Sequence, residues 1–123
     1  MLRVAVPNKG SLNDPATQLL SAAGYRVHRE HKALFATDVT NDVQFVFLRP
    51  ADIARNVGAG ALEVGITGQD LLAAAGNTEA TIELLPLDFG VSKFYFAAPH
   101  GVLTSTADLD GKRVATSFPA LVA

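Results

Sequence analysis

The sequence contains no cysteine, which excludes a disulfide framework and thiolate metal sites. It has no apolar run near the roughly 20 residues that a membrane span needs, and its first ten residues become polar too early for a signal peptide. The 10 basic and 12 acidic residues give a formal net charge of -2 without a long block of either sign. This balance argues against a nucleic-acid stripe and a basic membrane-binding helix. We expect a cytoplasmic protein with neither nucleic-acid nor membrane partners.

Residues that ligate metals are sparse and scattered. The three histidines lack carboxylates at ligand spacing, and Asp108 and Asp110 before Gly111 lack the other ligands of a calcium loop. No protein-built metal site is predicted. The chain is instead rich in apolar residues: 49% of its 123 residues are hydrophobic, enough to bury roughly two-thirds of the unfolded surface around one core. We expect a globular α/β protein.

The most informative stretch is residues 47–72. Residues 43–48 form an apolar run typical of a strand covered on both faces, and Pro50 suits the first position of a helix, which leaves Arg49 extended before it. Gly58 or Gly60 is predicted to end that helix, and residues 62–66 form the next strand. A right-handed crossover would then place Arg49 and the turn over residues 67–70 at the carboxyl ends of neighbouring parallel strands. Open α/β sheets bind ligands at this edge. Helix N-termini at such corners favour anions.

The flanking regions follow the same logic. Residues 2–6 are predicted as a buried strand and residues 7–12 as a polar loop; a helix with Ala16, Leu19, Leu20 and Ala23 on one face then ends at Gly24. Extended segments are expected over 25–30 and 33–39, with a turn at 40–42. After a helix over 69–75, residues 81–87 are expected to be extended.

A change of character occurs at Asp88-Phe89-Gly90, which we interpret as a crossover between two lobes. Strands are predicted over 92–98 and 112–116, with a short helix that begins in a capping box at Ser105 and Asp108. Residues 117–122 resemble the first turn of another helix, yet only one turn remains. We therefore expect a fragment with a first lobe over 1–91 and a truncated second lobe over 92–123.

Five segments in order resemble the ATP phosphoribosyltransferase family. They are residues 4–12 (VAVPNKGSL), 47–53 (FLRPADI), 64–71 (VGITGQDL), 87–90 (LDFG) and 111–119 (GKRVATSFP). Each segment is weak alone, but their joint order and spacing are specific.

The resemblance implies the first step of histidine biosynthesis, in which N1 of ATP attacks C1 of phosphoribosyl pyrophosphate and displaces pyrophosphate. It also implies Mg²⁺ bound mainly through substrate phosphates, a homo-oligomer at full length, and a two-lobed fold of the type II periplasmic-binding-protein kind. Holding two polyanions in line calls for cations and helix N-termini, so no side-chain nucleophile or acid/base residue is assigned.

The resemblance places candidate substrate contacts at the corners of the first lobe. Lys9 and Gly10 belong to the first strand-to-helix loop, although a lysine in a turn is often simply solvated. Arg49 offers a rigid fork to phosphate, with an ion pair to Asp52 or Asp70 as the structural alternative.

The second corner carries the other first-lobe candidates: Thr67, Gly68, Gln69, Asp70 and Leu71. Thr67 and Asp70 also satisfy a capping-box pattern, which needs no ligand to explain it.

In the second lobe, Ser92, Thr116 and Ser117 are candidate contacts, with helix capping as the alternative for Thr116 and Ser117. Lys93, Lys112 and Arg113 are more typical of solvated surface. The basic group Arg26, His28, Arg29, His31 and Lys32 is interpreted as a solvated face or subunit contact, and only Lys32 is considered near substrate.

One family feature is missing. The acidic pair and Thr- and Gly-rich turn that bind phosphoribosyl pyrophosphate should follow Thr116, and the chain does not contain them. We therefore expect this chain to be inactive by itself. The alternative function is a small-molecule binding module of the same fold without catalysis.

Overall fold

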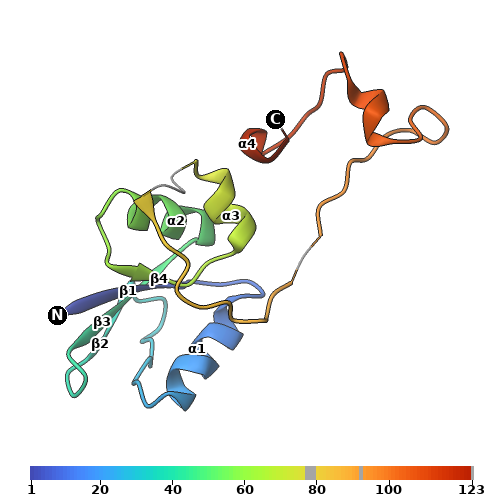
Figure 1. Cartoon of the computed structure of the whole chain (residues 1–123). Helices are drawn as coiled ribbons and strands as arrows, with labels where there is room; N and C mark the ends of the chain where they lie inside the picture. The colour runs from blue at the N-terminus through green and yellow to red at the C-terminus, as the bar shows by residue number, and fades with distance from the viewer. Residues whose placement is uncertain (77–79, 92, 123) are drawn as a thin grey trace.

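A four-stranded mixed sheet organises the first half of the chain (Figure 1). The structure is a computed structural model that describes residues 1–76, 80–91 and 93–122. Its strands are β1 (Leu2–Pro7), β2 (Phe35–Asp38), β3 (Val43–Leu48) and β4 (Val64–Gly65), in the spatial order β2-β3-β1-β4. The helices are α1 (Asn13–Ala22), α2 (Pro50–Gly58), α3 (Gln69–Ala74), a short 3-10 helix η2 (Thr106–Leu109), and α4 (Pro119–Val122). The expected α/β class is confirmed.

The first strand occupies the centre of the parallel part of the sheet. β1 runs parallel to β3, from Leu2 opposite Val43 onward, and parallel to β4, with Val4 opposite Val64. The expectation that β3 and β4 are neighbours is therefore wrong, because β1 lies between them. All three strands still end at the same rim, so the loop after β1 lies between the two predicted corners.

Side chains alternate between two cores on the two faces of the sheet. Val4, Val6, Phe45 and Phe47 pack with Ala16 of α1 on one face. The second core holds Ala5 and Val46 of the sheet, together with Ile53 of α2 and Leu62. Figure 1 shows the two helices on opposite sides of the strands. The prediction that residues 43–48 are covered on both faces is confirmed.

Helix boundaries follow the predicted local signals. Arg49 is extended (φ -65°, ψ 141°) and Pro50 opens α2. Gly24 and Gly60 both have positive φ, where a residue with a Cβ is disfavoured, and each follows a helix whose last carbonyls accept its N–H and that of the next residue. Of the two glycines proposed to end α2, Gly58 is its last residue and Gly60 makes the left-handed turn.

Two predictions in the first half are wrong. Leu19 and Ala23 do not share the buried face of α1, because they are exposed while Ala16 is fully buried and Leu20 packs on the core. The capping box at Thr67 is absent as well: Gly68 is the N-cap of α3 and the Thr67 hydroxyl bonds to another element. Tertiary contacts override local preference at both places.

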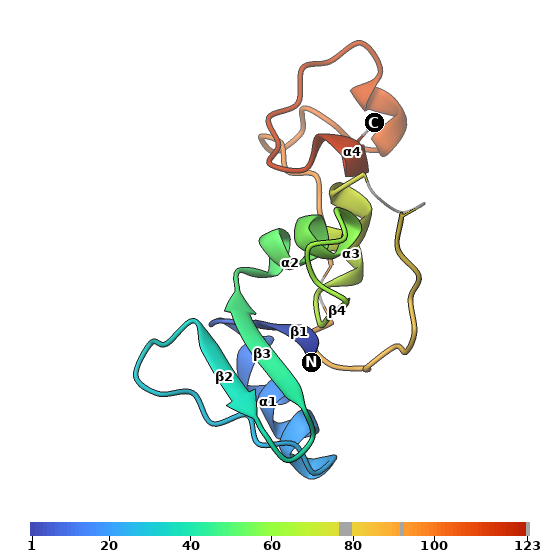
Figure 2. The same cartoon turned by 90° about the vertical axis from the view of Figure 1, so that its left-hand side faces the viewer.

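The second half forms fewer elements than predicted. The strands predicted over 92–98 and 112–116 are not observed among the described residues of those ranges, and residues 81–87, which were expected to be extended, belong to no strand of the described sheet. Large apolar side chains such as Ile82, Leu84 and Tyr95 are 81%, 71% and 82% exposed. A strand forms beside another strand with which it pairs, and the strand pairs of the described sheet do not include these segments. Figures 1 and 2 show residues 93–122 apart from the sheet, on the side of α3.

The local features predicted for residues 105–122 are nevertheless present. η2 begins with the predicted capping box of Ser105 and Asp108, Gly111 follows at positive φ, and α4 is the expected single turn. None of the described helices is long and apolar enough to cross a membrane.

Candidate functional site

A concave region of about 430 Å³ lies at the rim where β1 and β3 end. We call it the rim cavity. It is lined by Asn8, Lys9, Gly10, Ser11, Leu12, Arg49, Pro50, Ala51 and Leu71. The rim cavity thus joins the loop after β1, the start of α2 and one residue of α3. Of the predicted site residues, it brings together Lys9, Gly10, Arg49 and Leu71.

The loop after β1 is fixed at both of its ends. The N–H of Asn8 donates to the Leu48 carbonyl at 2.8 Å, and the Asn13 side chain donates to the Pro7 carbonyl at 2.6 Å. Between these anchors Lys9 is exposed and Gly10 has a φ of +82°. The lysine therefore stands at the cavity on a loop whose ends are held by the sheet and α1.

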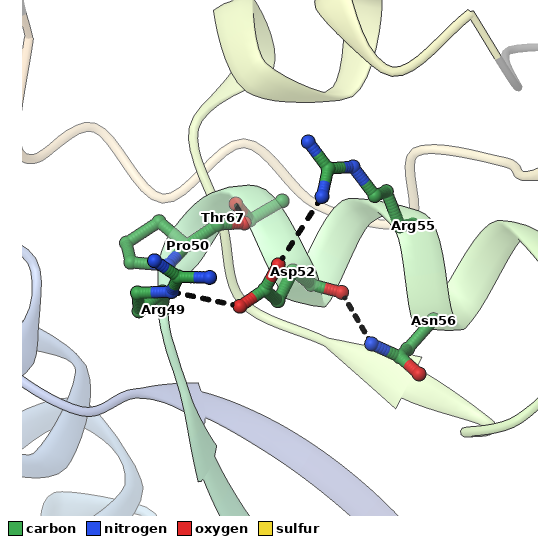
Figure 3. Close-up of polar contacts among 6 residues, drawn as sticks. All are labelled: Arg49, Pro50, Asp52, Arg55, Asn56 and Thr67. Atoms are coloured by element: carbon green, nitrogen blue, oxygen red, sulfur yellow. Dashed lines mark hydrogen bonds and ion pairs between the residues drawn. The ribbon is translucent and has the colours of Figure 1, made fainter.

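Arg49 takes part in an ion-pair cluster at the first turn of α2. Its Nε donates to Asp52 Oδ2 at 2.9 Å, and Arg55 Nη1 donates to the other oxygen at 3.4 Å (Figure 3). The Arg49 side chain is 71% exposed, and Nε makes its only side-chain hydrogen bond within residues 1–76, 80–91 and 93–122. The pair with Asp52 that the sequence left open is present, and the terminal guanidinium nitrogens remain available to a ligand.

The second corner is tied to the first by one hydrogen bond. Thr67 Oγ1 donates to the Pro50 carbonyl at 2.7 Å, so the turn before α3 is fastened to the start of α2. Gln69 Nε2 donates to Glu83 at 3.3 Å, and the Asp70 carboxylate lies over the Cα of Gly68. These four residues do not line the rim cavity; Leu71 alone represents this corner there.

The predicted second-lobe contacts that the structure describes do not line the rim cavity. Ser117 lines a separate cavity of about 170 Å³ with Arg55, Leu71 and Phe118. Thr116 Oγ1 accepts the N–H of Phe118 at 2.9 Å, which is a local turn before α4 and not a cap of that helix. Ser92 lies outside the described residues. The structure therefore does not bring Thr116 and Ser117 to the rim cavity.

Three carboxylates among the described residues have perturbed pKa values, and none of the three lines the rim cavity. The Asn41 side chain and the Arg26 N–H hold the pKa of Asp38 below its usual range by hydrogen bonding. Arg3 similarly lowers the pKa of Glu63, and Thr104 lowers that of Asp108. Within the part of the chain that the structure describes, no three His, Cys, Asp or Glu residues are grouped to hold a metal ion. The cavity offers cations and amides for binding anions.

Sequence reasoning missed several cavity residues. Asn8, Ser11, Leu12, Pro50 and Ala51 line the rim cavity and were not named as contacts. Their signal was available, because they adjoin Lys9 and Arg49 in the two loops already singled out. It also missed Arg29, which is half-buried against Phe47 and does not lie on a solvated face.

Comparison with known proteins identifies the family. The family model described as HisG: ATP phosphoribosyltransferase matches residues 49–123. Relatives named ATP phosphoribosyltransferase are 56% identical in Pseudarthrobacter chlorophenolicus and 53% identical in Mycobacterium tuberculosis, each over 99% of this chain. The chain spans 42% of the length of these relatives.

A solved structure agrees at the level of the fold. It is described as the ATP phosphoribosyl transferase (HisG:HisZ) complex from Thermotoga maritima, and it matches with a TM-score of 0.53 and 21% identity over 80% of this chain and 41% of that one. This likeness shows the fold alone. The family is shown by the family model, which matches more than half of the sequence: the chain belongs to the ATP phosphoribosyltransferase family.

Proposed function

We propose that this chain serves the transfer of a phosphoribosyl group from phosphoribosyl pyrophosphate to ATP, the first step of histidine biosynthesis. A bond forms between N1 of the purine and C1 of the ribose, and the bond from C1 to the pyrophosphate oxygen breaks. Negative charge grows on the departing pyrophosphate. The protein therefore has to hold two polyanions and stabilise that charge.

The observation that carries this proposal is the pairing of Lys9 and Arg49 in one cavity of a member of this family. The two cations come from separate loops, and Ala51, which also lines the cavity, is the first residue of α2 that has an amide hydrogen. Such a rim suits a phosphate or pyrophosphate group. Asp52 offsets part of the Arg49 charge, so a phosphate would compete with that ion pair.

The remaining candidates are proposed to act when the cleft is complete. Thr67, Gly68, Gln69 and Asp70 would face substrate from the second corner, and Ser92, Thr116 and Ser117 from a second lobe. A lobe over 1–91 and another beginning at 92 is supported by the exposed apolar side chains beyond residue 81, which call for a covering layer. The type II periplasmic-binding-protein arrangement is part of this proposal, as are the homo-oligomer and the cytoplasmic location.

Magnesium is proposed to arrive on the substrate phosphates. The described residues do not fit a protein-built magnesium site, since they contain no cluster of three candidate ligands. What the chain supplies itself is orientation: Lys9 and Arg49 would fix the position of a phosphate chain relative to the purine.

The test compares two arginines that share one carboxylate partner. Arg49→Ala is expected to weaken ATP or pyrophosphate binding by about 1–3 kcal/mol, the range for a lost charged hydrogen bond. Arg55→Ala is the matched control, because Arg55 pairs with Asp52 at similar exposure but does not line the rim cavity. Calorimetric titration of both variants, in this chain and in a polypeptide completed to the relatives' length, measures the difference. Equal affinities for the two variants would refute a ligand role for Arg49.

A further inference from the structure

We propose that Arg29 is a positioning residue that aims the backbone of the Lys9 loop at a bound phosphate group. Its guanidinium forms a bridge between two loops: Nη1 donates to the Asn8 carbonyl at 2.8 Å, and Nε donates to the Ala33 carbonyl at 2.7 Å. Arg29 lies 21 positions beyond Asn8 in the chain, so this contact is tertiary. The inference rests on the proposed function and adds a residue to it.

The guanidinium is held in place by a buried aromatic ring. Cζ of Arg29 lies 4.9 Å from the centre of the Phe47 ring, within the range of a cation–π contact. Phe47 is 1% exposed and belongs to the core of the sheet, so its ring is a rigid platform. A planar guanidinium over such a ring has its N–H groups directed sideways, where the two carbonyls accept them.

The hydrogen bond to Asn8 sets the direction of the next amide. In a trans peptide the C=O of Asn8 and the N–H of Lys9 lie on opposite edges of one plane. Because the carbonyl faces Arg29, the Lys9 N–H points away from Arg29. We infer that it points toward the rim cavity, which Asn8, Lys9 and Gly10 all line. The ligand class that this arrangement suits is a phosphate or pyrophosphate, which would accept from the Lys9 amide as well as from its ammonium group.

A solvated-face role for Arg29 predicts something different. A surface arginine could be replaced without effect on the loop. Arg29 instead donates hydrogen bonds from both Nε and Nη1, and its guanidinium lies over the Phe47 ring. Arg26 provides the contrast three residues earlier: it is exposed, and its backbone N–H makes the hydrogen bond to Asp38. The same charge is lost in Arg29→Ala and Arg26→Ala, but only the first loses the bridge.

The experiment uses the whole chain with pyrophosphate as the probe. Arg29→Ala is expected to weaken pyrophosphate binding about tenfold, the effect of one charged hydrogen bond, and to shift the amide NMR signals of Lys9 and Gly10. Arg26→Ala should leave both unchanged. Millimolar methylguanidinium should restore part of the affinity of Arg29→Ala by occupying the space over Phe47, without an effect on the wild-type chain.

A conservative variant separates charge from geometry. Arg29→Lys keeps the charge but cannot reach two carbonyls with a planar fork, so its affinity should remain several-fold below wild type. This variant also replaces Arg29→Ala should that protein fail to fold. Lys9 and Gly10 signals that stay in place in Arg29→Lys and Arg29→Ala would overturn the proposal.

The two proposals fail in different ways. A wild-type chain that does not bind pyrophosphate would contradict the proposed function at this cavity. The Arg29 proposal is then still judged by the amide signals of Lys9 and Gly10, which do not depend on a ligand.

Discussion

A single buried carboxylate holds the turn between β2 and β3 against the segment that follows α1. Asp38 is fully buried, and it accepts hydrogen bonds from the Arg26 N–H at 2.9 Å, the Asn41 N–H at 3.1 Å and the Asn41 side chain at 2.7 Å. Hydrogen bonds to an ionised acceptor are stronger than neutral ones, and an ionised carboxylate can accept from all three donors. The contribution of Asp38 to stability therefore depends on the negative charge of its carboxylate.

We predict that Asp38→Asn lowers the free energy of unfolding at neutral pH, because an amide has one acceptor oxygen and presents donors to donors. The pKa of Asp38 in the folded chain lies below its ordinary value of 3.8, so its stabilising effect is complete above that value and is lost as the pH falls through the folded pKa. Urea unfolding should show a large difference in the free energy of unfolding between variant and wild type at pH 7. This difference should be smaller at pH 3. Asp42→Asn, an exposed carboxylate in the same turn, is the control; a pH-independent difference for Asp38→Asn would contradict the prediction.

At this scale the sequence was informative where a residue acts through its own backbone. Pro50 restricts one φ angle and Gly24 allows a positive one. As predicted, Pro50 begins α2 and Gly24 follows the end of α1. Thr67 was misassigned because its hydroxyl had two acceptable partners, a local amide and the Pro50 carbonyl. Only the packing of α2 beside α3 decides between them.

At the scale of elements, the bond between Thr67 and Pro50 fastens two neighbouring helices at their starts. The starts of α2 and α3 carry the two predicted corners, so their relative position defines the width of the rim cavity between Ala51 and Leu71. Gly65 adds a second constraint: a Cβ built on it would lie 2.5 Å from Ile53 Cγ2, so β4 approaches α2 closely.

We predict that Thr67→Val lowers the free energy of unfolding by about 1 kcal/mol, the net value of one hydrogen bond. Valine keeps the shape of threonine and removes its hydroxyl donor. Thr67→Ser retains the donor and should stay closer to wild type in urea unfolding. A serine variant as unstable as the valine variant would mean that the methyl group, and not the hydrogen bond, matters at this position.

Elements with local causes were predicted, and elements that need distant partners were not. α2 and β3 follow from Pro50 and from the apolar run before it. The predicted strands over 92–98 and 112–116 have the right composition, yet a strand also requires a neighbour with free N–H and C=O groups. The order of the strands was missed for the same reason, since no local signal states that β1 lies between β3 and β4.

At the scale of the molecule, the chain combines a packed first half with an open second half. Apolar side chains as large as Phe94 and Tyr95 are 55% and 82% exposed, whereas Phe45 and Phe47 are each 1% exposed. The chain also spans 42% of the length of its relatives in Pseudarthrobacter and Mycobacterium. The proposed second lobe would cover such side chains.

We predict that this chain alone yields no product in a single-turnover assay with ATP and phosphoribosyl pyrophosphate. The reason is that the acidic-pair loop expected after Thr116 is missing from it. A polypeptide completed to the relatives' length is the positive control, and its amides over 82–87 and 93–98 should exchange slowly with solvent. Product that forms in proportion to the short chain would refute the prediction, and equally fast exchange in both polypeptides would count against the two-lobed arrangement.

The candidate site was predictable to the same extent as the fold. Lys9, Gly10 and Arg49 were named because they follow strands, and strands end at a common rim. Arg29 was placed on a solvated face because its sequence neighbours are charged. Its partners, Phe47 and Asn8, come from other strands and loops, which a linear pattern does not reveal.

The central position of β1 also determines when the sheet is able to assemble during synthesis. The β2–β3 hairpin closes through a local turn, but β1 pairs with β3 and with β4, and Arg3 meets Glu63 across 60 positions of sequence. Contacts between residues so far apart in sequence form only after loop closure, which slows folding. β1 therefore cannot complete its pairing until β4 has been synthesised, and until then the edge of β1 that binds β4 stays unpaired.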